Sequence, residues 1–387
     1  MHIPFCVSKC PYCDFNSHVG LEHLFATYNE ALCAEIRRWG EELGHPRLHT
    51  VFVGGGTPSR VPGAHIRRVM ETVRQSFDLA PDAEVTLEAN PQSAEADRLD
   101  GWLEAGINRI SIGFQSLDPS ALAFLERAHT AGEAVTVFRR ARAAGFRNVN
   151  VDLIYAIPGL STARWGDVLA EVVALAPDHV SAYELTPEAG TRLGADVAAG
   201  RTVLPDDDVK LEQLDVAEGL LAAAGLERYE VSNWARPGRR CRHNLAYWGG
   251  EPYAAAGAGA HAHVVGSPYP GWVGAPAPAA VSLRQWNIAN PAAYITAVRE
   301  RGEAHAGHEW LDAATAVGDH LMMGLRTREG VDLDVVQSWY GVDVARASAG
   351  RVAELRAAGL VHLDGTRLRA STAGWRLLNQ VTLAFLP

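Results

Sequence analysis

The chain has 387 residues and a formal net charge of −10, from 35 Lys and Arg against 45 Asp and Glu. Hydrophobic residues make up 48% and charged residues 21%, a composition typical of globular proteins that excludes a disordered or fibrous chain. The negative charge argues against electrostatically driven binding to nucleic acid or to an anionic membrane, and the length allows one large domain and a smaller one.

Secretion and membrane insertion are not expected. Cys6, Lys9 and Cys10 interrupt the first residues, where a signal peptide would need an apolar segment. The longest stretch without charged residues, Pro252 to Leu283, contains five Pro and five Gly, which exclude an unbroken spanning helix. An odd number of cysteines does not suit a disulfide scaffold. We therefore expect a cytoplasmic protein with no integral membrane segment.

Short apolar strand patterns alternate with amphipathic helical patterns up to about residue 235. Six alternations predict a parallel α/β sheet, although periodicity alone leaves open whether the sheet curls into a barrel. Glycine, proline and polar residues follow several of these strands, at the edge where active sites of α/β proteins collect. The predicted strands are 2–5, 49–53, 84–88, 109–113, 148–153 and 179–185, and the helices between them are 25–39, 64–77, 94–105, 131–144 and 162–174.

The second part of the chain contains two regions that differ in composition. Residues 236–300 are rich in Ala, Gly, Pro and Trp, and we interpret them as a connecting segment that could carry function, with 252–283 loop-rich and packed on protein. Beyond Trp310 the pattern predicts helices at 311–326, 333–340 and 345–358, then a hairpin around Asp364-Gly365. This order suggests a small winged-helix-like module, and its balanced charges favour a lid or docking role over DNA binding. We expect three segments, 1–235, 236–305 and 306–387.

Three cysteines, Cys6, Cys10 and Cys13, lie in a C-x3-C-x2-C pattern directly after the first predicted strand. Three thiolates from one loop can hold three irons of a [4Fe–4S] cluster and leave the fourth iron open, as a reactive metal site requires. Zinc is the alternative, with a fourth ligand from a nearby histidine (His2, His18 or His23). Structural zinc more often uses two C-x2-C pairs, so we favour the [4Fe–4S] cluster. Cys33 fits a helix core.

The cysteine pattern at the start of a strand–helix alternation resembles the radical S-adenosylmethionine (SAM) superfamily. Gly54-Gly55-Gly56-Thr57-Pro58, after the second strand, is similar to the glycine-rich segment of that superfamily, which contacts the SAM amino group through its backbone. Glycine suits this task because its backbone can approach a charged ligand closely. The resemblance implies a partial (β/α)6 barrel that binds a [4Fe–4S] cluster and SAM.

Further motifs resemble the HemN (coproporphyrinogen III dehydrogenase) branch of this superfamily over essentially the whole chain. They include H-I-P-F-C at 2–6, E-x-N-P at 88–91, R-x-S-x-G-x-Q-S at 109–116, D-L-I-Y-x-x-P-G at 152–159 and G-L-R-x-R-E-G at 324–330. Carboxylates can accept hydrogen bonds from SAM, and Gln and Arg can bind its carboxylate. The resemblance implies a SAM pocket formed by Tyr12, Gly55, Gly56, Thr57, Glu88, Gln115, Arg127 and Asp152.

Two functions compete within the branch. The dehydrogenase would cleave SAM with a reduced [4Fe–4S] cluster and abstract hydrogen from porphyrinogen propionates. The HemW sub-branch would instead bind heme and deliver it to acceptor proteins, such as respiratory ones, with a reductant serving the cluster. The dehydrogenase has a fourth Cys two residues after the third, where this chain has Phe15. We therefore expect a heme chaperone, whereas a tRNA-modifying enzyme fits poorly with the acidic charge.

The segment Arg242–Trp248 matches the H-N-x-x-Y-W motif associated with heme in HemW-like proteins. We expect His243 to ligate the iron and Tyr247 and Trp248 to contact the macrocycle. Cys241 is a rival ligand, and the weaker candidates are His261 and His263. Propionates could pair with Arg239, Arg240 and Arg242. The alternative is a structural histidine among core aromatics.

One departure from the resemblance concerns the first strand. The family usually has a Tyr two residues before the histidine of H-I-P-F-C, where it helps to seat SAM. Here Met1 directly precedes His2, so that position is missing. A shortened strand would expose the hydrogen-bonding edge of its neighbour, and we therefore expect that translation begins upstream of Met1.

Overall fold

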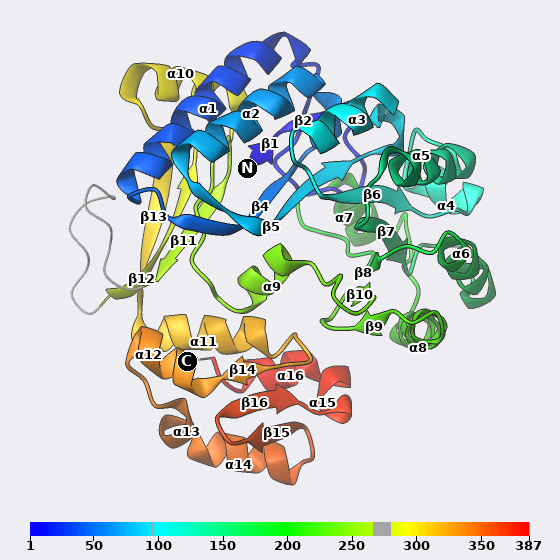
Figure 1. The fold of residues 1–387 in the computed structure, drawn as a ribbon. Coiled ribbons are helices and arrows are strands. Elements are labelled where there is room, and N and C mark those ends of the chain that lie inside the picture. The colour runs from blue at the N-terminus through cyan, green and yellow to red at the C-terminus, as the bar shows by residue number, and fades with distance from the viewer. Residues whose placement is uncertain (95, 266–279, 387) are drawn as a thin grey trace.

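The computed structural model describes residues 1–94, 96–265 and 280–386. Its largest element is an eight-stranded sheet in the order β1-β4-β5-β6-β7-β8-β10-β9 (Figure 1). The first six strands are parallel to their neighbours, and β10 and β9 add an antiparallel edge. The partial (β/α)6 barrel is thereby confirmed, with β1 (His2–Ile3), β4 (Arg47–Gly55), β5 (Asp78–Ala89), β6 (Arg109–Gln115), β7 (Val149–Tyr155), β8 (His179–Glu184), β9 (Glu227–Arg228) and β10 (Asn233–Ala235).

Helices connect successive strands and cover the outer face of the sheet (Figure 1). The predicted helices at 131–144 and 162–174 agree with α5 and α6 in both bounds. Local signals explain this agreement, because a Thr130–Glu133 capping box starts α5 and Gly145 ends it with φ of 114°. The helices are α1 (Phe25–Glu42), α2 (Gly63–Ser76), α3 (Ala96–Glu104), α4 (Pro119–Phe124), α5 (Ala131–Ala144), α6 (Thr162–Ala174), α7 (Arg192–Ala198) and α8 (Asp207–Ala223).

Several expectations for the barrel need correction. Pro4 divides the first predicted strand into β1 and β2 (Phe5–Cys6), and β2 pairs with β3 (His18–Val19) instead of joining the large sheet. Proline cannot donate a hydrogen bond to a sheet ladder, which accounts for the break. Helices α4 and α8 were not expected, although Asp118 and Asp206 cap them in the usual way.

The described part of the connecting segment contains helices and strands that its composition did not predict. It forms α9 (Arg242–Trp248), α10 (Pro291–Arg301) and a three-stranded antiparallel sheet of β11 (His261–Val265), β12 (Ala280–Asn287) and β13 (His305–Asp312). The uncharged stretch at 252–283 falls partly outside the described residues. Among the residues that are described, no helix is both long and apolar enough to cross a membrane.

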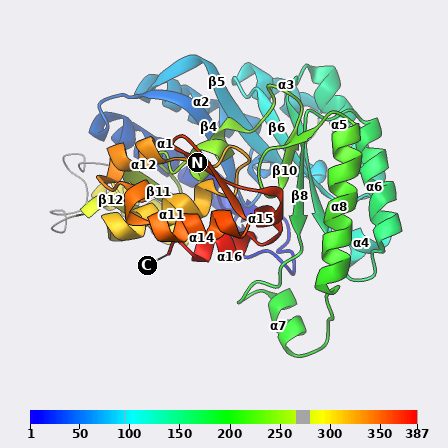
Figure 2. The same ribbon diagram turned by 90° about the horizontal axis from the view of Figure 1, so that it is seen from below.

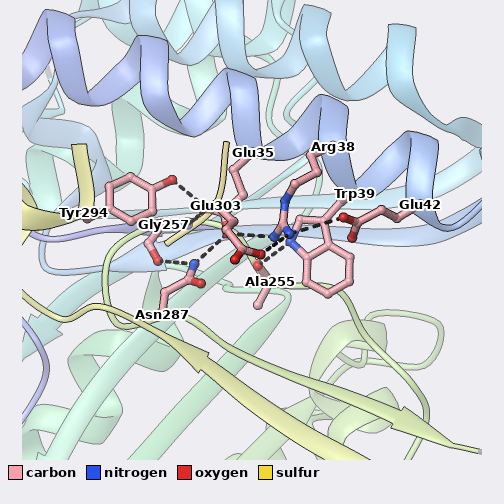
Figure 3. Close-up of polar contacts among 9 residues, drawn as sticks. All are labelled: Glu35, Arg38, Trp39, Glu42, Ala255, Gly257, Asn287, Tyr294 and Glu303. Atoms are coloured by element: carbon pink, nitrogen blue, oxygen red, sulfur yellow. Dashed lines mark hydrogen bonds and ion pairs between the residues drawn. The ribbon is translucent and has the colours of Figure 1, made fainter. Parts of the chain in front are cut away.

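A buried carboxylate joins this segment to the barrel. Glu35 of α1 accepts hydrogen bonds from the Gly257 amide (2.8 Å), Asn287 Nδ2 (2.6 Å) and the Tyr294 hydroxyl (2.6 Å), as Figure 3 shows. Arg38 lies 3.9 Å from the same carboxylate. Burial raises the pKa of Glu35. Because three donors from separate elements meet on one side chain, Glu35 fixes how the connecting segment sits against α1.

Residues 255–258 also cover the free edge of β1. The His2 amide donates to the Ala256 carbonyl (2.8 Å). The Tyr28 hydroxyl donates to the His2 carbonyl (2.8 Å) and accepts from the Ala258 amide (2.8 Å). The edge that would otherwise present unpaired backbone groups is therefore satisfied by the connecting segment.

The C-terminal part has its own hydrophobic core, formed by residues from Leu311 to Val381. The predicted helix at 345–358 is divided at Ser348, and the hairpin loop is Gly365-Thr366, with φ of 62° at Gly365. Helix α11 contacts β12 and β13, and Figure 2 shows it beside β12. The elements are α11 (Ala313–Gly324), β14 (Val331–Asp332), α12 (Leu333–Tyr340), α13 (Val344–Ala347), α14 (Ala349–Ala357), β15 (Val361–Asp364), β16 (Arg367–Ala370), α15 (Thr372–Arg376) and α16 (Leu378–Leu383).

Candidate functional site

A cavity of about 440 Å3 opens at the carboxyl ends of the parallel strands, and we call it the strand-end cavity. Its lining comes from the cysteine loop and from the ends of β4, β5, β6 and β7. Parallel strands bring their carboxyl ends to one edge, so residues far apart in sequence meet there. All the residues predicted for the [4Fe–4S] cluster and SAM line this cavity: Cys6, Cys10, Tyr12, Cys13, Gly55, Gly56, Thr57, Glu88, Gln115, Arg127 and Asp152.

The glycines after β4 let the chain pass close to the cysteine loop. Gly55 has φ of 121°, and a Cβ there would overlap the imidazole of His2. A Cβ on Gly56 would lie 2.9 Å from the backbone of Phe5 and 3.0 Å from Cys6 Sγ. Both contacts are shorter than ordinary packing allows, so any side chain would push the two loops apart. This physical requirement accounts for the glycines whatever ligand binds.

Cys6, at the end of β2, and Cys10 and Cys13, in the loop that follows, all line the cavity. The Cys13 amide donates to the Cys10 carbonyl (3.2 Å), and Cys6 Sγ lies 3.5 Å from Thr57 Oγ1. Arg127 Nη1 donates to Cys10 Sγ (3.4 Å). Among the described residues, no three His, Cys, Asp or Glu side chains are placed to hold one metal ion. In a [4Fe–4S] cluster each thiolate binds a different iron, so the three thiols need not converge on one point and the donor set fits.

Arg127 is held by a residue absent from the predicted SAM pocket. Its NH2 donates to Asn90 Oδ1 (2.6 Å), and Asn90 Nδ2 donates to Thr57 Oγ1 (3.0 Å). Arg127 Nε is buried and has no hydrogen-bond partner within the described residues, which leaves it available to an anionic group in the cavity. The position of Asn90 directly after a predicted strand was the signal that could have identified it.

Two partly buried carboxylates, Glu88 and Asp152, line the cavity. Glu88 Oε2 accepts from the Gly55 amide (3.0 Å), and Asp152 accepts from Ser111 Oγ (2.8 Å) and Asn150 Nδ2 (2.8 Å). Burial, together with the charge of Asp152, raises the pKa of Glu88 to about 7, and burial raises the pKa of Asp152. A cationic ligand would offset this cost, so the two carboxylates suit a positively charged group such as an amine or sulfonium.

A second cavity of about 510 Å3 lies where α9, β11, β12 and α11 come together, and we call it the α9–α11 cavity. Tyr247 and Trp248 of the predicted heme motif line it, as does His263. His261 stacks on Trp286 and is not among the lining residues. The lining also includes His320, Met322 and Met323 of α11, Tyr340 of α12 and Glu230, none of which the sequence had marked.

His243 lies behind this cavity with both ring nitrogens engaged. Nδ1 is 2.8 Å from Thr50 Oγ1, and Nε2 is 3.0 Å from the Tyr247 hydroxyl. The ring stacks on Phe52, with centroids 5.0 Å apart. Burial, with smaller effects from the N-terminus and Arg109, lowers the pKa of His243 to about 3. In this arrangement the imidazole is a neutral packing and hydrogen-bonding group.

The remaining motif residues anchor α9 to the sheet. The amides of Arg242 and His243 donate to the Glu84 carboxylate (3.0 and 3.1 Å), and Cys241 Sγ, fully buried, donates to it as well (3.5 Å). A carboxylate at a helix N-terminus is favourable because it satisfies free amides and the helix dipole. The three arginines predicted for propionates pair with acids and do not line the α9–α11 cavity: Arg239 with Asp178, Arg240 with Glu227 and Glu329, and Arg242 with Asp82.

A chain of buried hydrogen bonds connects the two regions. The Cys241 amide donates to the Tyr229 hydroxyl (3.2 Å), which lies 2.8 Å from His179 Nε2. His179 Nδ1 lies 2.6 Å from Asn150 Oδ1, and Asn150 donates to Asp152 (2.8 Å). The chain thus runs from the start of α9 to the lining of the strand-end cavity.

Comparisons with known proteins agree with this architecture. The family profile of the Radical SAM superfamily matches residues 1–172, and that of the HemN C-terminal domain matches residues 311–377. A protein named heme chaperone HemW from Mycobacterium tuberculosis (strain H37Rv) is 37% identical over 389 residues, which cover 100% of this chain and 94% of that protein. HemW of Escherichia coli K12 is 40% identical over 265 residues, 68% of this chain and 69% of the relative.

Two further matches extend the comparison. The mitochondrial radical S-adenosyl methionine domain-containing protein 1 of Mus musculus is 36% identical over 398 residues, covering 100% of this chain and 86% of the relative. The solved structure of coproporphyrinogen III oxidase (HemN) from Escherichia coli aligns with a TM-score of 0.81 at 24% identity, covering 99% of this chain and 88% of that one, a likeness of fold. The chain therefore belongs to the HemW family, within the HemN-like branch of the radical SAM superfamily.

Proposed function

We propose that this chain is a heme chaperone that binds a [4Fe–4S] cluster, SAM and heme, and transfers heme to an acceptor protein. The observation that carries the proposal is the α9–α11 cavity, which lies beside the H-N-x-x-Y-W segment and shares only Tyr183 with the described lining of the strand-end cavity. A cofactor site and a cargo site can then coexist in one chain. The HemW relatives are named heme chaperones, which supports the same function for this chain.

The strand-end cavity would hold the cofactors. Cys6, Cys10 and Cys13 would bind three irons, and SAM would occupy the space between Gly55–Thr57 and the two carboxylates. When bound, a reduced [4Fe–4S] cluster supplies an electron to SAM. Arg127 would bind the SAM carboxylate through its free Nε, and the carboxylates of Glu88 and Asp152 would face the positive groups of SAM.

The α9–α11 cavity would hold heme. Its size falls in the range of small-molecule sites, and Tyr247, Trp248 and Tyr340 provide flat apolar surface for a macrocycle. Heme that is to be passed on must be bound reversibly. A cavity between two parts of the chain can open by a small displacement of one of them, which suits release to an acceptor.

The alternative is oxygen-independent coproporphyrinogen III dehydrogenase. The strand-end cavity has all the groups expected for SAM, so radical chemistry is compatible with the geometry. Against it stands Phe15, which is 62% exposed at the cavity where the dehydrogenase pattern has a fourth cysteine. The likeness to the HemN structure concerns the fold and does not favour either activity.

One pair of assays separates these functions. Purified chain with reconstituted iron and sulfide should bind hemin with a Soret band and pass it to apomyoglobin, which a separation of the two proteins would detect. Under anaerobic conditions, with SAM and a chemical reductant, it should leave coproporphyrinogen III unconverted. Formation of protoporphyrinogen would establish the dehydrogenase, and failure to bind or transfer heme would reject the chaperone.

Two expectations complete the proposal. The described free cysteines form no disulfide, and an iron–sulfur protein of this kind needs a reducing compartment, so we place it in the cytoplasm with a cellular reductant for the cluster. Segments 1–235, 236–305 and 306–387 would act as cofactor core, connecting segment and C-terminal domain. Because β13 (His305–Asp312) crosses the last boundary and pairs with β12, expression of 313–387 alone, followed by measurement of its unfolding, tests whether the C-terminal part folds independently.

A further inference from the structure

His320 occupies a distinctive place in the α9–α11 cavity. It lies on α11, belongs to the C-terminal part of the chain, and its side chain is only 5% exposed. Its ring is packed edge-on between Trp339 and Tyr340, with centroid distances of 5.6 and 5.8 Å. A buried histidine on the wall of a large cavity needs an explanation beyond filling space, because an apolar residue would do that at lower cost.

The two ring nitrogens of His320 have different surroundings. Nδ1 lies 3.3 Å from the Tyr340 hydroxyl. Nε2 has no hydrogen-bond partner among the described residues, and the residue lines the cavity. Metal-binding histidines in proteins usually have one nitrogen on the metal and the other held by a hydrogen bond that fixes the ring. His320 has this arrangement before any ligand is present.

The surroundings of His320 favour the form that binds iron. Burial, with a smaller effect of His263, lowers the pKa of His320 to about 4, so the imidazole is neutral at pH 7. Gly250 borders the ring, and a Cβ there would lie 2.8 Å from Nδ1. The absence of a side chain at Gly250 therefore lets the backbone after α9 pass close to the Nδ1 side of the ring.

His243 is also a neutral imidazole, but it differs from His320 in its access to the cavity. Both of its nitrogens are hydrogen-bonded, one face of its ring is stacked on Phe52, and it does not line the cavity. Iron ligation by His243 would require breaking its contact with Thr50 or with Tyr247. Ligation by His320 requires neither, because its Nε2 makes no contact that must be lost.

We propose that heme bound in the α9–α11 cavity is ligated by His320 Nε2, with Tyr340 as the residue that orients the ring. The macrocycle would lie against Tyr247 and Trp248, and Met322 and Met323 would pack on its edge. Arg284 is the one Lys or Arg among the described lining residues, and it would meet a propionate once released from Asp319. This inference rests on the proposed heme-binding function and assigns its iron ligand to a different domain from the H-N-x-x-Y-W motif.

Hemin titration of the full-length protein tests this assignment. His320→Ala should shift the Soret band, change the electron paramagnetic resonance signal of the ferric heme and weaken affinity at least 10-fold, and added imidazole should restore the signal. His362→Ala, on an exposed histidine of the same domain, is the matched control. His243→Ala should keep the spectrum of ligated heme.

The outcomes are distinct for each proposal. A wild-type protein that binds no hemin rejects the chaperone function as a whole. A wild-type protein that binds hemin, with an unchanged spectrum in His320→Ala or a lost one in His243→Ala alone, rejects His320 as the ligand. Tyr340→Phe provides a milder variant if His320→Ala unfolds. It should keep the ligand but alter the reduction potential of the heme, and an unaltered potential would contradict the orienting role of Tyr340.

Discussion

The two cavities of this protein differ in how the chain builds them. The strand-end cavity is formed by loops that follow parallel strands. Its polar groups lie in short motifs at 6–13, 55–57 and 88–90 and at Gln115, Arg127 and Asp152. The α9–α11 cavity is formed by side chains from positions 183 to 340, in elements that belong to two different cores. The first site is therefore a property of the barrel, whereas the second exists only when the C-terminal part is packed on α9.

The largest expected effect separates the two cavities directly. Replacing Cys6, Cys10 and Cys13 by Ser should abolish bound iron and sulfide, because Ser is a poor ligand for iron in this cluster type. Hemin binding should remain, since none of these residues lines the α9–α11 cavity. Iron and sulfide analysis and a hemin titration measure the two properties, with Cys33→Ala as the control. Loss of hemin binding in the triple variant would mean that the cavities are not separate sites.

Glu35→Ala should destabilise the fold by about 4 kcal/mol, because it leaves buried donors of Gly257, Asn287 and Tyr294 without an acceptor. The damage should fall on the segment next to the α9–α11 cavity. Denaturant unfolding and amide hydrogen exchange at Gly257 measure these effects, and Glu41→Ala on the exposed face of α1 is the control. Equal loss of stability in both variants would remove the special role of Glu35.

A pH experiment compares acidic residues of the two cavities. Burial raises the pKa of Glu230, on the wall of the α9–α11 cavity, from 4.5 to about 7. The folded state then binds a proton more tightly than the unfolded chain, so stability falls as pH rises between these values. Glu230→Gln should raise the free energy of unfolding at pH 8 by up to about 3 kcal/mol and leave it unchanged at pH 4.

The same substitution at Glu88 sharpens the contrast. Burial and Asp152 also raise the pKa of Glu88 to about 7, but a cationic ligand would need its charge. Glu88→Gln should therefore weaken SAM binding, measured calorimetrically at pH 8, whereas Glu230→Gln should leave it unaffected. Glu300→Gln, exposed on α10, controls for the loss of one negative charge.

In the stability experiment, the free energy of unfolding of Glu230→Gln is compared with that of the wild type at each pH. If the difference did not change with pH, titration of Glu230 would not be its cause.

The smallest effect concerns His243. Thr50→Val removes the hydroxyl that contacts His243 Nδ1 and should cost about 1 kcal/mol of stability. The Soret band of bound heme should be the same as in wild type, because the change affects the anchoring of α9 and leaves the iron ligand in place. Thermal unfolding measures the stability of Thr50→Val, and a hemin titration measures its Soret band. A shifted Soret band without loss of stability would instead identify His243 as the iron ligand.

The sequence predicts the barrel and the strand-end cavity well because both depend on local signals. Capping residues and apolar periodicity define α5 and α6, and strand-end motifs define the lining of the cavity. The sequence shows that Asn90 follows a strand, but it does not predict the contact of Asn90 with Arg127, because this contact joins two loops that are distant in the chain. The β11–β13 sheet was missed because the Gly and Pro residues around its strands are typical of loops and Ala is disfavoured in strands, and tertiary pairing overrode these preferences.

The α9–α11 cavity could not be predicted in the same way. His320 occupies a position in α11 that reads as part of an ordinary amphipathic helix, and nothing in the chain near it resembles a ligand motif. The proposed role of His320 depends on its contacts with Tyr340 and Gly250, which are 20 and 70 positions away in the chain. The H-N-x-x-Y-W motif does identify α9, but it predicts His243 as the iron ligand. Both ring nitrogens of His243 are already hydrogen-bonded in the structure.

The buried chain from Cys241 through Tyr229, His179 and Asn150 to Asp152 has a thermodynamic consequence. A ligand that displaces α9 changes the partners of Asp152, and a ligand that recruits Asp152 changes the partners of α9. Any effect of SAM on heme affinity must then be matched by an equal effect of heme on SAM affinity, because linkage between two sites is reciprocal. Such a linkage would let SAM occupancy tune the heme affinity of a site that also exists without the cluster, so release would need no covalent change to the heme.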